Sequence, residues 1–263
     1  MAISYSIILP AYNESERLGA SLEKVLAYVA EQGWNAEILV VNDGSRDNTG
    51  EIARQFAARN PSVRVLENPG NRGKGYSVRH GVLESRGEFI LFSDSDLSSP
   101  IREASKLFAR LREGADVAFG SRWLETNLQT ERQSVLRQIV GRLYNILLRV
   151  TLGLNYKDTQ CGLKAFTRAA AEVVFTRQTI ERWGFDPELL FIARKFKLRM
   201  VEVPVEWAHD DRSKINPLVD GVKMGIEMLR IRWAGIAGEY KSPRWEFAHT
   251  RSVGIAFPAT NSR

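Results

Sequence analysis

Two aspartates, Asp94 and Asp96, stand two residues apart directly after the apolar run Phe89–Phe92. Such a run predicts a buried strand, and unpaired carboxylates at its end would be costly to bury. Carboxylate oxygens suit Mg²⁺ or Mn²⁺, and a divalent ion shared with a diphosphate would neutralise a leaving nucleoside diphosphate. We therefore predict that both aspartates bind a metal and are catalytic. The structural alternative is that they only cap the helix expected after Pro100.

Two earlier polar segments also follow predicted strands. Pro10–Ser15 contains Asn13 and Ser15, either of which could cap the next helix and leave its N–H groups for an anionic ligand, with an ordinary cap as the simpler interpretation. Asn42–Ser45 places Asp43 at a tight glycine turn, where its carboxylate could accept hydrogen bonds from a ribose or a base. A carboxylate that bonds only to its own turn fits the same pattern.

A third segment, Asn71–Gly75, is basic, rich in glycine and opens a predicted helix. Its backbone could approach phosphates closely, and a plain surface turn is the alternative. It is not a P-loop, because the spacing of that motif and its Lys-Ser/Thr pair are absent.

Short β-branched runs alternate with amphipathic segments through the first half of the chain, a pattern that predicts strands joined by helices. The runs are Ile7–Leu9, Ile38–Val41, Val63–Leu66, Phe89–Phe92 and Val117–Phe119. They are apolar on both faces, as strands covered on both sides must be. We therefore predict an α/β fold with a doubly wound, mostly parallel sheet over residues 3–122. Ligands of such sheets bind at the carboxyl ends of the strands, where the polar segments lie.

The second half of the chain predicts an amphipathic helix at 131–153, with apolar residues at helical spacing and arginines on the other faces. We also expect a polar loop at 155–160, a helix near 187–196, a strand at 200–205 and a helix near 217–233. Together with the sheet these elements make one domain, 1–240. Residues 241–263 show no period and are expected to form a loosely ordered tail.

Composition narrows the partners without choosing among them. The formal net charge of +6 favours nucleic acid, phosphate-bearing small molecules or an acidic membrane surface. Cys161 is the only cysteine, so no intramolecular disulfide is possible, and the three histidines lack zinc-ligand spacing. We expect no signal peptide before the first strand and no transmembrane helix, since Arg149 interrupts the longest apolar stretch.

Five segments occur in a fixed order: Pro10–Glu14, Asn42–Ser45, Asn71–Gly75, Asp94–Asp96 and Gly120–Arg122. In this order they resemble the motifs of inverting family-two glycosyltransferases, which have the GT-A fold. The resemblance implies that the Asp-x-Asp pair holds metal and diphosphate and that upstream carboxylates hold the nucleotide. The nucleotide-binding residues implied are Pro10, Tyr12, Glu14, Asp43, Gly44, Lys74 and Asp94.

Four segments of the second half narrow the subgroup: Asp158–Lys164, Trp183–Asp186, Val203–Val205 and Arg212–Lys214. They resemble dolichyl-phosphate glucosyltransferases and their bacterial polyprenyl-phosphate relatives, and the resemblance covers about residues 4–235. Dolichyl-phosphate mannose synthases share most of these features but commonly carry Gln where this chain has Ser98. That departure favours glucose and leaves a third metal ligand open.

The resemblance implies inverting, metal-dependent transfer of a hexose to a polyprenyl phosphate such as dolichyl or undecaprenyl phosphate, with glucose from UDP-glucose favoured. Residues 3–122 would be the nucleotide-sugar-binding half of the catalytic domain and 123–240 the acceptor-binding half. A phosphate monoester with a second pKa of about 6 is largely dianionic at neutral pH, so the acceptor needs cations more than a general base.

Basic side chains are expected to bind the acceptor phosphate, and a second set of residues is expected to bind the sugar. Arginine can grip phosphate oxygens at two points and lysine serves as a point charge, although solvated surface charge is the alternative for each. The expected phosphate-binding residues are Arg122, Arg137, Arg212 and Lys214. The expected sugar-binding residues are Asp158, Gln160, Trp183 and Asp186, with Glu188 as a weaker candidate and helix capping as the alternative for Asp186. Arg122 and Asp158 join the catalytic set, and Asp158 could orient a sugar hydroxyl, act as a base or brace an arginine.

Membrane contact is expected to be peripheral and on the cytoplasmic side. Helix 131–153 could lie in an anionic membrane interface or pack on the core, and an anchoring subunit is a further route to the membrane.

Several other functions stay open or are disfavoured. Mannosyl transfer from GDP-mannose and transfer to a soluble acceptor stay open. Nucleotidyltransferases usually carry a Gly-rich loop that Pro10–Ser15 lacks, and Leu229–Trp233 lacks the Gln of the polysaccharide-synthase motif. A noncatalytic sugar-nucleotide sensor is disfavoured by the intact aspartate pair. Nucleic acid is not expected as a partner, because acidic residues line the predicted ligand edge.

Overall fold

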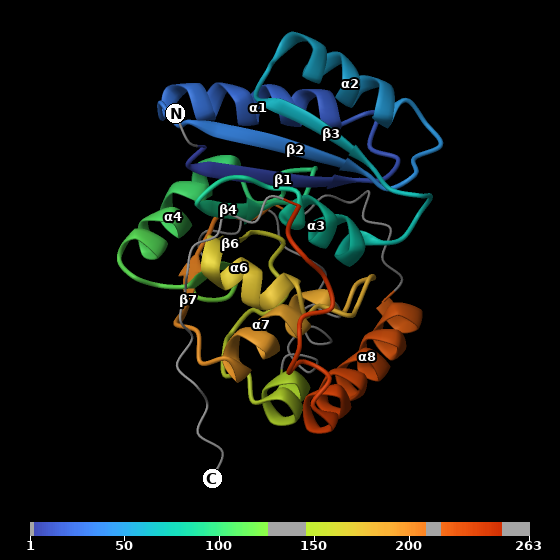
Figure 1. The fold of residues 1–263 in the computed structure, drawn as a ribbon, viewed down its shortest axis with the longest axis vertical. Coiled ribbons are helices and arrows are strands. Elements are labelled where there is room, and N and C mark those ends of the chain that lie inside the picture. The colour runs from blue at the N-terminus through green and yellow to red at the C-terminus, as the bar shows by residue number, and fades with distance from the viewer. Residues whose placement is uncertain (1–2, 126–145, 209–216, 249–263) are drawn as a thin grey trace.

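The structure, a computed structural model, describes residues 3–125, 146–208 and 217–248. Within them seven strands form one sheet in the order β3-β2-β1-β4-β6-β5-β7 (Figure 1). The strands are β1 (Tyr5–Ala11), β2 (Ala36–Asn42), β3 (Val63–Glu67), β4 (Phe89–Phe92), β5 (Val117–Ser121), β6 (Lys164–Thr167) and β7 (Met200–Pro204). β6 runs antiparallel between β4 and β5, and the other neighbouring strands are parallel.

Helices cover both faces of this sheet. They are α1 (Leu18–Glu31), α2 (Thr49–Arg59), α3 (Lys74–Leu83), the 3₁₀ turn η1 (Ile101–Glu103), α4 (Ala104–Arg112), α6 (Arg168–Phe175), α7 (Phe185–Lys195) and α8 (Pro217–Ala237). α1, α2 and α4 share a core with Ile7 and Leu9, whereas α3, α6, α7 and α8 share the opposite core with Ile8. Figure 1 shows α1 and α2 above β1 and β2, with α3 and α6 below. Alternate side chains of the central strands thus enter two cores, which explains why these strands are mostly apolar on both faces.

The doubly wound, mostly parallel sheet predicted from the sequence is confirmed. The five predicted strands of the first half are β1 to β5, and β7, α7 and α8 match the later predictions. β6 and α6 were not predicted. β6 has four residues and begins with the buried Lys164, so its pattern is too short and too polar at one end to identify a strand.

The end of the predicted helix 131–153 is described as a helical segment at 146–152, and the rest lies outside the described residues. Leu148 and Leu152 of this segment are buried in the core. Its exposed apolar side chains are Ile146, Leu147 and Val150. Over these residues the segment therefore packs on the core with one side and presents an apolar surface with the other.

Residues 241–248, the described part of the predicted tail, form no helix or strand but pack on the body of the domain. The backbone N–H groups of Arg244 and Trp245 donate to the carbonyl of Thr176, and the Phe247 side chain is buried. Among the described residues, no helix combines the length and the apolarity needed to cross a membrane.

Candidate active site

The carboxyl ends of several strands meet at one edge of the sheet. β1 is parallel to β2 and β4, and β5 points the same way because β6 is antiparallel to both β4 and β5. The segments that leave these strands carry Tyr12, Asp43, Asp94 and Arg122. Residues far apart in the sequence are thereby gathered at the edge where doubly wound sheets bind their ligands.

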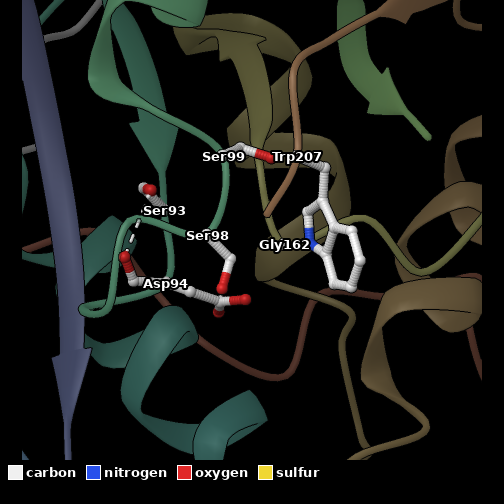
Figure 2. A pocket seen from close by; sticks show the side chains of 6 residues that line it. All are labelled: Ser93, Asp94, Ser98, Ser99, Gly162 and Trp207. Atoms are coloured by element: carbon white, nitrogen blue, oxygen red, sulfur yellow. Dashed lines mark hydrogen bonds between the residues drawn. The ribbon is translucent and has the colours of Figure 1, made fainter. Parts of the chain in front are cut away.

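Asp94 is the centre of this edge. Its carboxylate forms an ion pair with the ammonium of Lys74, the first residue of α3. A Cβ atom on Gly162 would lie 2.0 Å from Asp94 Oδ2, so a larger residue at this position would displace the Asp94 carboxylate. Figure 2 shows the Asp94 carboxylate beside the Ser98 hydroxyl, facing the ring of Trp207. The small pocket at this point is lined by Ser93, Asp94, Ser98, Ser99, Gly162 and Trp207.

Asp96 lies next to a second cation, Arg17. Oδ1 of Asp96 accepts a hydrogen bond from the Ser98 N–H at 2.9 Å, and Oδ2 lies 3.8 Å from Arg17 Nη1. Arg17 also donates through Nε to Glu14 Oε2 at 2.7 Å. Burial, and then the charge of Asp94, raise the pKa of Asp96 above its ordinary value. Two neighbouring carboxylates of this kind favour a bound cation.

The helix-capping interpretations of these segments are wrong. η1 follows Pro100 and α1 begins at Leu18, and neither has a side-chain cap. Asn13 Oδ1 instead accepts a hydrogen bond from the Arg46 N–H at 2.8 Å, which ties the segment after β1 to the segment after β2. The polar residues at this edge therefore organise loops rather than helix ends.

Asp43 organises the glycine-rich loop Asn71–Gly75. Its Oδ1 accepts hydrogen bonds from Asn68 Nδ2 at 2.7 Å and from the Arg72 N–H at 2.9 Å, and its Oδ2 accepts from the Gly73 N–H at 2.8 Å. The alternative in which Asp43 bonds only to its own turn is wrong. Its predicted contact with the nucleotide stays a prediction, because both carboxylate oxygens already hold this loop.

Gly44 is required where these two loops meet. It has φ +67°, and an added Cβ would lie 2.6 Å from the carbonyl carbon of Gly70. Of the other predicted nucleotide-binding residues, Pro10 is buried within β1 and Tyr12 lies just beyond it, partly buried. All of the predicted nucleotide set therefore lies along this edge.

Arg122 and Asp158 form a two-point ion pair after β5. Arg122 Nε donates to Oδ2 of Asp158 at 2.6 Å and Nη2 donates to Oδ1 at 2.9 Å. Glu202 Oε1 in turn accepts the Asp158 N–H at 2.7 Å, and the Arg122 guanidinium lies over the Trp207 ring at 5.4 Å. Burial alone would raise the pKa of Asp158, but Arg122 lowers it. Of the roles left open for Asp158, bracing an arginine is the one the contacts support.

The predicted sugar-binding residues differ in burial and in their partners. Asp186 is buried, and its Oδ1 accepts a hydrogen bond from the fully buried Lys164 ammonium at 2.5 Å, so the capping alternative does not describe it. Trp183 is exposed near Lys74, whose Nζ lies 5.9 Å from its ring centroid. Gln160 is partly buried, and its N–H donates to Asp158.

The weaker candidate, Glu188, has a structural role instead. It is fully buried, and its carboxylate accepts hydrogen bonds from Thr179, from the Ile180 N–H and from the Tyr240 hydroxyl. The expectation of a sugar contact at this position is therefore wrong. Arg137, Arg212 and Lys214 lie outside the described residues, so their predicted phosphate contacts stay predictions.

Sequence reasoning missed four residues that shape the site. They are Arg17, Lys164, Glu202 and Trp207. Lys164 belongs to the segment Asp158–Lys164, which drew attention for its resemblance, yet its partner Asp186 lies 22 residues away. Nothing in a single sequence pairs such distant side chains, and only the fold brings them together.

The side chains at this edge suit a divalent metal ion. Asp94 and Asp96 offer carboxylate oxygens only, which are the ligands that Mg²⁺ and Mn²⁺ prefer. Among the described residues no group of three or more metal-binding side chains gathers, so the remaining ligands would come from a bound diphosphate and water. Residues Asp94 and Asp96 would hold the metal, and the glycine at 162 keeps the space around Asp94 open.

Comparison with known proteins agrees with this geometry. Residues 6–175 match the family described as Glycosyl transferase family 2. The chain belongs to this family. The predictions of a glycosyltransferase and of the GT-A fold are thereby confirmed.

Members of the family with high similarity share a name. A dolichyl-phosphate beta-glucosyltransferase of Trichomonas vaginalis is 38% identical over 238 residues, which cover 86% of this chain and 70% of that protein. A protein of the same name from Drosophila melanogaster is 36% identical over 253 residues, which cover 91% of this chain and 78% of that protein.

A solved structure shows the same fold at lower identity. Glucosyl-3-phosphoglycerate synthase from Mycobacterium tuberculosis, crystallised with Mn²⁺ and UDP-glucose, superposes with a TM-score of 0.64 at 20% identity. The superposition covers 88% of this chain and 79% of the other.

Proposed function

We propose that this enzyme transfers glucose from UDP-glucose to dolichyl phosphate and inverts the anomeric configuration. The observation that carries the proposal is the 36–38% identity, over most of the chain, to enzymes named dolichyl-phosphate beta-glucosyltransferase. The edge of the sheet supplies what the reaction needs: paired carboxylates, a glycine-rich loop at the start of a helix and a braced arginine.

The donor half of the site accounts for the nucleotide sugar. Asp43 fixes loop Asn71–Gly75 by accepting the N–H groups of Arg72 and Gly73, and this loop leads into the N-terminus of α3, an end of a helix where a diphosphate is favoured. A divalent ion at Asp94 and Asp96 would supply charge neutralisation of the leaving diphosphate. A solved structure of the same fold that holds Mn²⁺ and UDP-glucose supports the choice of this ion and this donor.

The acceptor half needs a cation for the lipid phosphate, and Arg122 is the described residue best placed for it. Asp158 holds one edge of the guanidinium and Trp207 supports its face, so the group is oriented before the acceptor binds. An oxygen of the acceptor phosphate would attack the anomeric carbon while the bond to UDP breaks and the electron pair leaves with UDP. The dianionic phosphate needs no proton removed, so no general base is required.

Membrane contact would come from the outer face of α8. Its exposed apolar side chains, between 62% and 68% accessible, are Ile226, Leu229, Trp233 and Ile236. They recur three, seven and ten residues along the helix, which places them on one face opposite the buried side. Exposed arginines at 230 and 232 flank this face and suit an anionic lipid surface. The cytoplasmic side of the membrane and an anchoring subunit stay predictions from the sequence.

The test is transfer of radiolabelled sugar from UDP-glucose or GDP-mannose to dolichyl or undecaprenyl phosphate, with Mn²⁺ or Mg²⁺. We expect metal-dependent label in the lipid phase with UDP-glucose. Asp96→Ala should reduce the rate at least about a hundredfold because charge stabilisation of the leaving group is lost. Glu113→Ala, which removes an exposed carboxylate at the end of α4, is the matched control and should keep the wild-type rate.

Two other outcomes of this assay would change the proposed function. Label from GDP-mannose alone would replace glucose by mannose as the transferred sugar. Label from neither donor on either lipid, with folded protein that binds UDP, would overturn the lipid acceptor.

A further inference from the structure

The ion pair between Lys74 and Asp94 is a contact that the proposed donor site leaves unexplained. The Lys74 ammonium pairs with Asp94, the carboxylate at the centre of the site. The ring centroids of Trp183 and Phe185 lie 5.9 Å and 5.8 Å from Nζ. The Lys74 side chain is only 17% exposed. The ammonium is therefore held between a carboxylate and two aromatic faces rather than extended into solvent.

The backbone of Lys74 is fixed independently of this ion pair. Gly73 has φ +109°, and a Cβ atom on Gly73 or Gly75 would meet the backbone oxygen of Glu181 or Ile180 within 2.7 Å. The Tyr76 N–H also donates to the Glu181 carbonyl. The start of α3 is thus anchored, and only the flexible side chain of Lys74 can move between partners.

The charges at the site nearly balance without any ion. Asp94, Asp96 and Glu14 contribute three negative charges, and Lys74 and Arg17 contribute two positive charges. A divalent cation alone would change the net charge of this group from −1 to +1 and would compete with Lys74 for Asp94. A divalent cation that arrives with a doubly charged diphosphate leaves the net charge unchanged, and the diphosphate gives the displaced ammonium a new partner.

We propose that Lys74 is an exchangeable counter-ion of Asp94, which keeps the affinity for a metal ion low until the donor diphosphate binds and draws the ammonium away. The proposal rests on the proposed metal-dependent transfer from a nucleotide diphosphate sugar. It adds that metal and donor bind with positive coupling and that one side chain sets the coupling. By linkage, UDP must tighten Mn²⁺ binding by the same factor by which Mn²⁺ tightens UDP binding.

The experiment measures Mn²⁺ binding by electron paramagnetic resonance, with and without UDP, and uses no acceptor lipid. Lys74→Met keeps the length of the side chain and its contact with the aromatic rings but removes the charge. In this variant we expect Mn²⁺ alone to bind on the order of tenfold tighter than in wild type, and the enhancement by UDP to shrink by a similar factor. Lys74→Arg keeps the charge and should keep the wild-type coupling.

Two controls fix the interpretation. Asp96→Asn should no longer bind Mn²⁺, so that the full signal of the free ion remains, which would show that the ion binds at this pair. Thermal unfolding shows that each variant is folded. The proposal is overturned if Lys74→Met binds Mn²⁺ alone no more tightly than wild type does. It is also overturned if UDP increases the Mn²⁺ affinity of both proteins by the same factor, or if no folded variant binds Mn²⁺. Because no sugar is transferred, coupling without glucosyltransferase activity would overturn the proposed function and leave this inference standing.

Discussion

Single residues at this site serve by holding other residues in place. Asp158 accepts hydrogen bonds from three N–H groups of Arg122 and from the Gln160 N–H, and its own N–H is held by Glu202. Asp43 does the same for the glycine-rich loop. Both carboxylates come from motifs that suggest direct contact with a ligand, and both act first on the protein.

Asp158→Asn should destabilise the fold as well as the reaction. It removes the carboxylate opposite a largely buried guanidinium, a change that costs about 3 kcal/mol when the partner charge is left unpaired. Chemical denaturation at pH 7 measures the difference from wild type. Gln160→Ala, which leaves the ion pair intact, should change stability far less.

Acid should reduce the difference in unfolding free energy between wild type and Asp158→Asn. Arg122 holds the pKa of Asp158 below the ordinary aspartate value of about 4, so the folded protein keeps the charge where the unfolded chain takes up a proton. The stabilisation is therefore complete above about pH 5 and is lost as the pH falls through the lowered folded pKa. Denaturation of wild type and Asp158→Asn at pH 7, 5 and 3 should show the gap narrow only at the acid end. If the difference in unfolding free energy stayed constant with pH, the destabilisation would come from packing and not from the ion pair.

Helix α8 packs one side on the core and exposes apolar side chains on the other. Met228, Ile231 and Ala234 are buried in the core, whereas the apolar face that begins at Ile226 is exposed. A soluble surface rarely keeps so continuous an apolar strip, and strips of this kind mark interaction sites.

Trp233→Glu should weaken binding to anionic vesicles without unfolding the protein. Burial of one large apolar side chain is worth about 1.5 kcal/mol or more, and the added negative charge opposes the lipid surface, so binding should fall at least about tenfold. Vesicle sedimentation at several salt concentrations measures this. Ala58→Glu adds the same charge to the exposed side of α2, at the far end of the molecule (Figure 1), and should bind as wild type does. Equal binding by all three proteins would rule out the α8 face as the docking surface.

The sequence predicted the elements whose patterns are long. β1, β2, β4 and β5 appeared as apolar runs because both of their faces are buried, whereas in β3, at the edge of the sheet, only Val63 is buried. The rule that ligands bind at the carboxyl ends of the strands then located Asp43, Asp94 and Arg122 correctly. β6 escaped because it is short and begins with a lysine. The pairs Lys164–Asp186 and Glu202–Asp158 could not be predicted, since each joins segments that only the finished sheet brings together.

At the scale of the whole molecule, the C-terminal segment joins parts that are distant in the sequence. Trp245 Nε1 donates to the Gln178 carbonyl at 3.2 Å, and the Arg79 guanidinium lies 4.2 Å from the Trp245 ring centroid. Gln178 also donates to the Gly75 carbonyl, so the segment supports the loop that begins α3. Residues beyond α8 therefore contribute to the geometry of the donor half.

Phe247→Ala should show that this segment belongs to the folded unit. The ring is buried in the core against Arg168, and truncation of such a ring costs about 3 kcal/mol. For a chain of this size that lowers the melting temperature by roughly 6–12 °C, which calorimetry resolves. Glu246→Ala, at the exposed neighbouring position, is the control. A Phe247→Ala protein that melts with wild type would mean that the segment is only loosely attached.

The antiparallel strand β6 also sets the order in which the chain can fold during synthesis. Strands β1 to β4 pair with one another and can form as soon as residues 1–112 are available. β5 follows next in the sequence, yet its partners are β6 and β7, so it must wait at least until β6, which ends at Thr167, has left the ribosome. Between these moments β4 and β5 have unpaired edges that could join other chains. A nascent chain stalled near residue 125 should therefore depend on chaperones more than one released at full length.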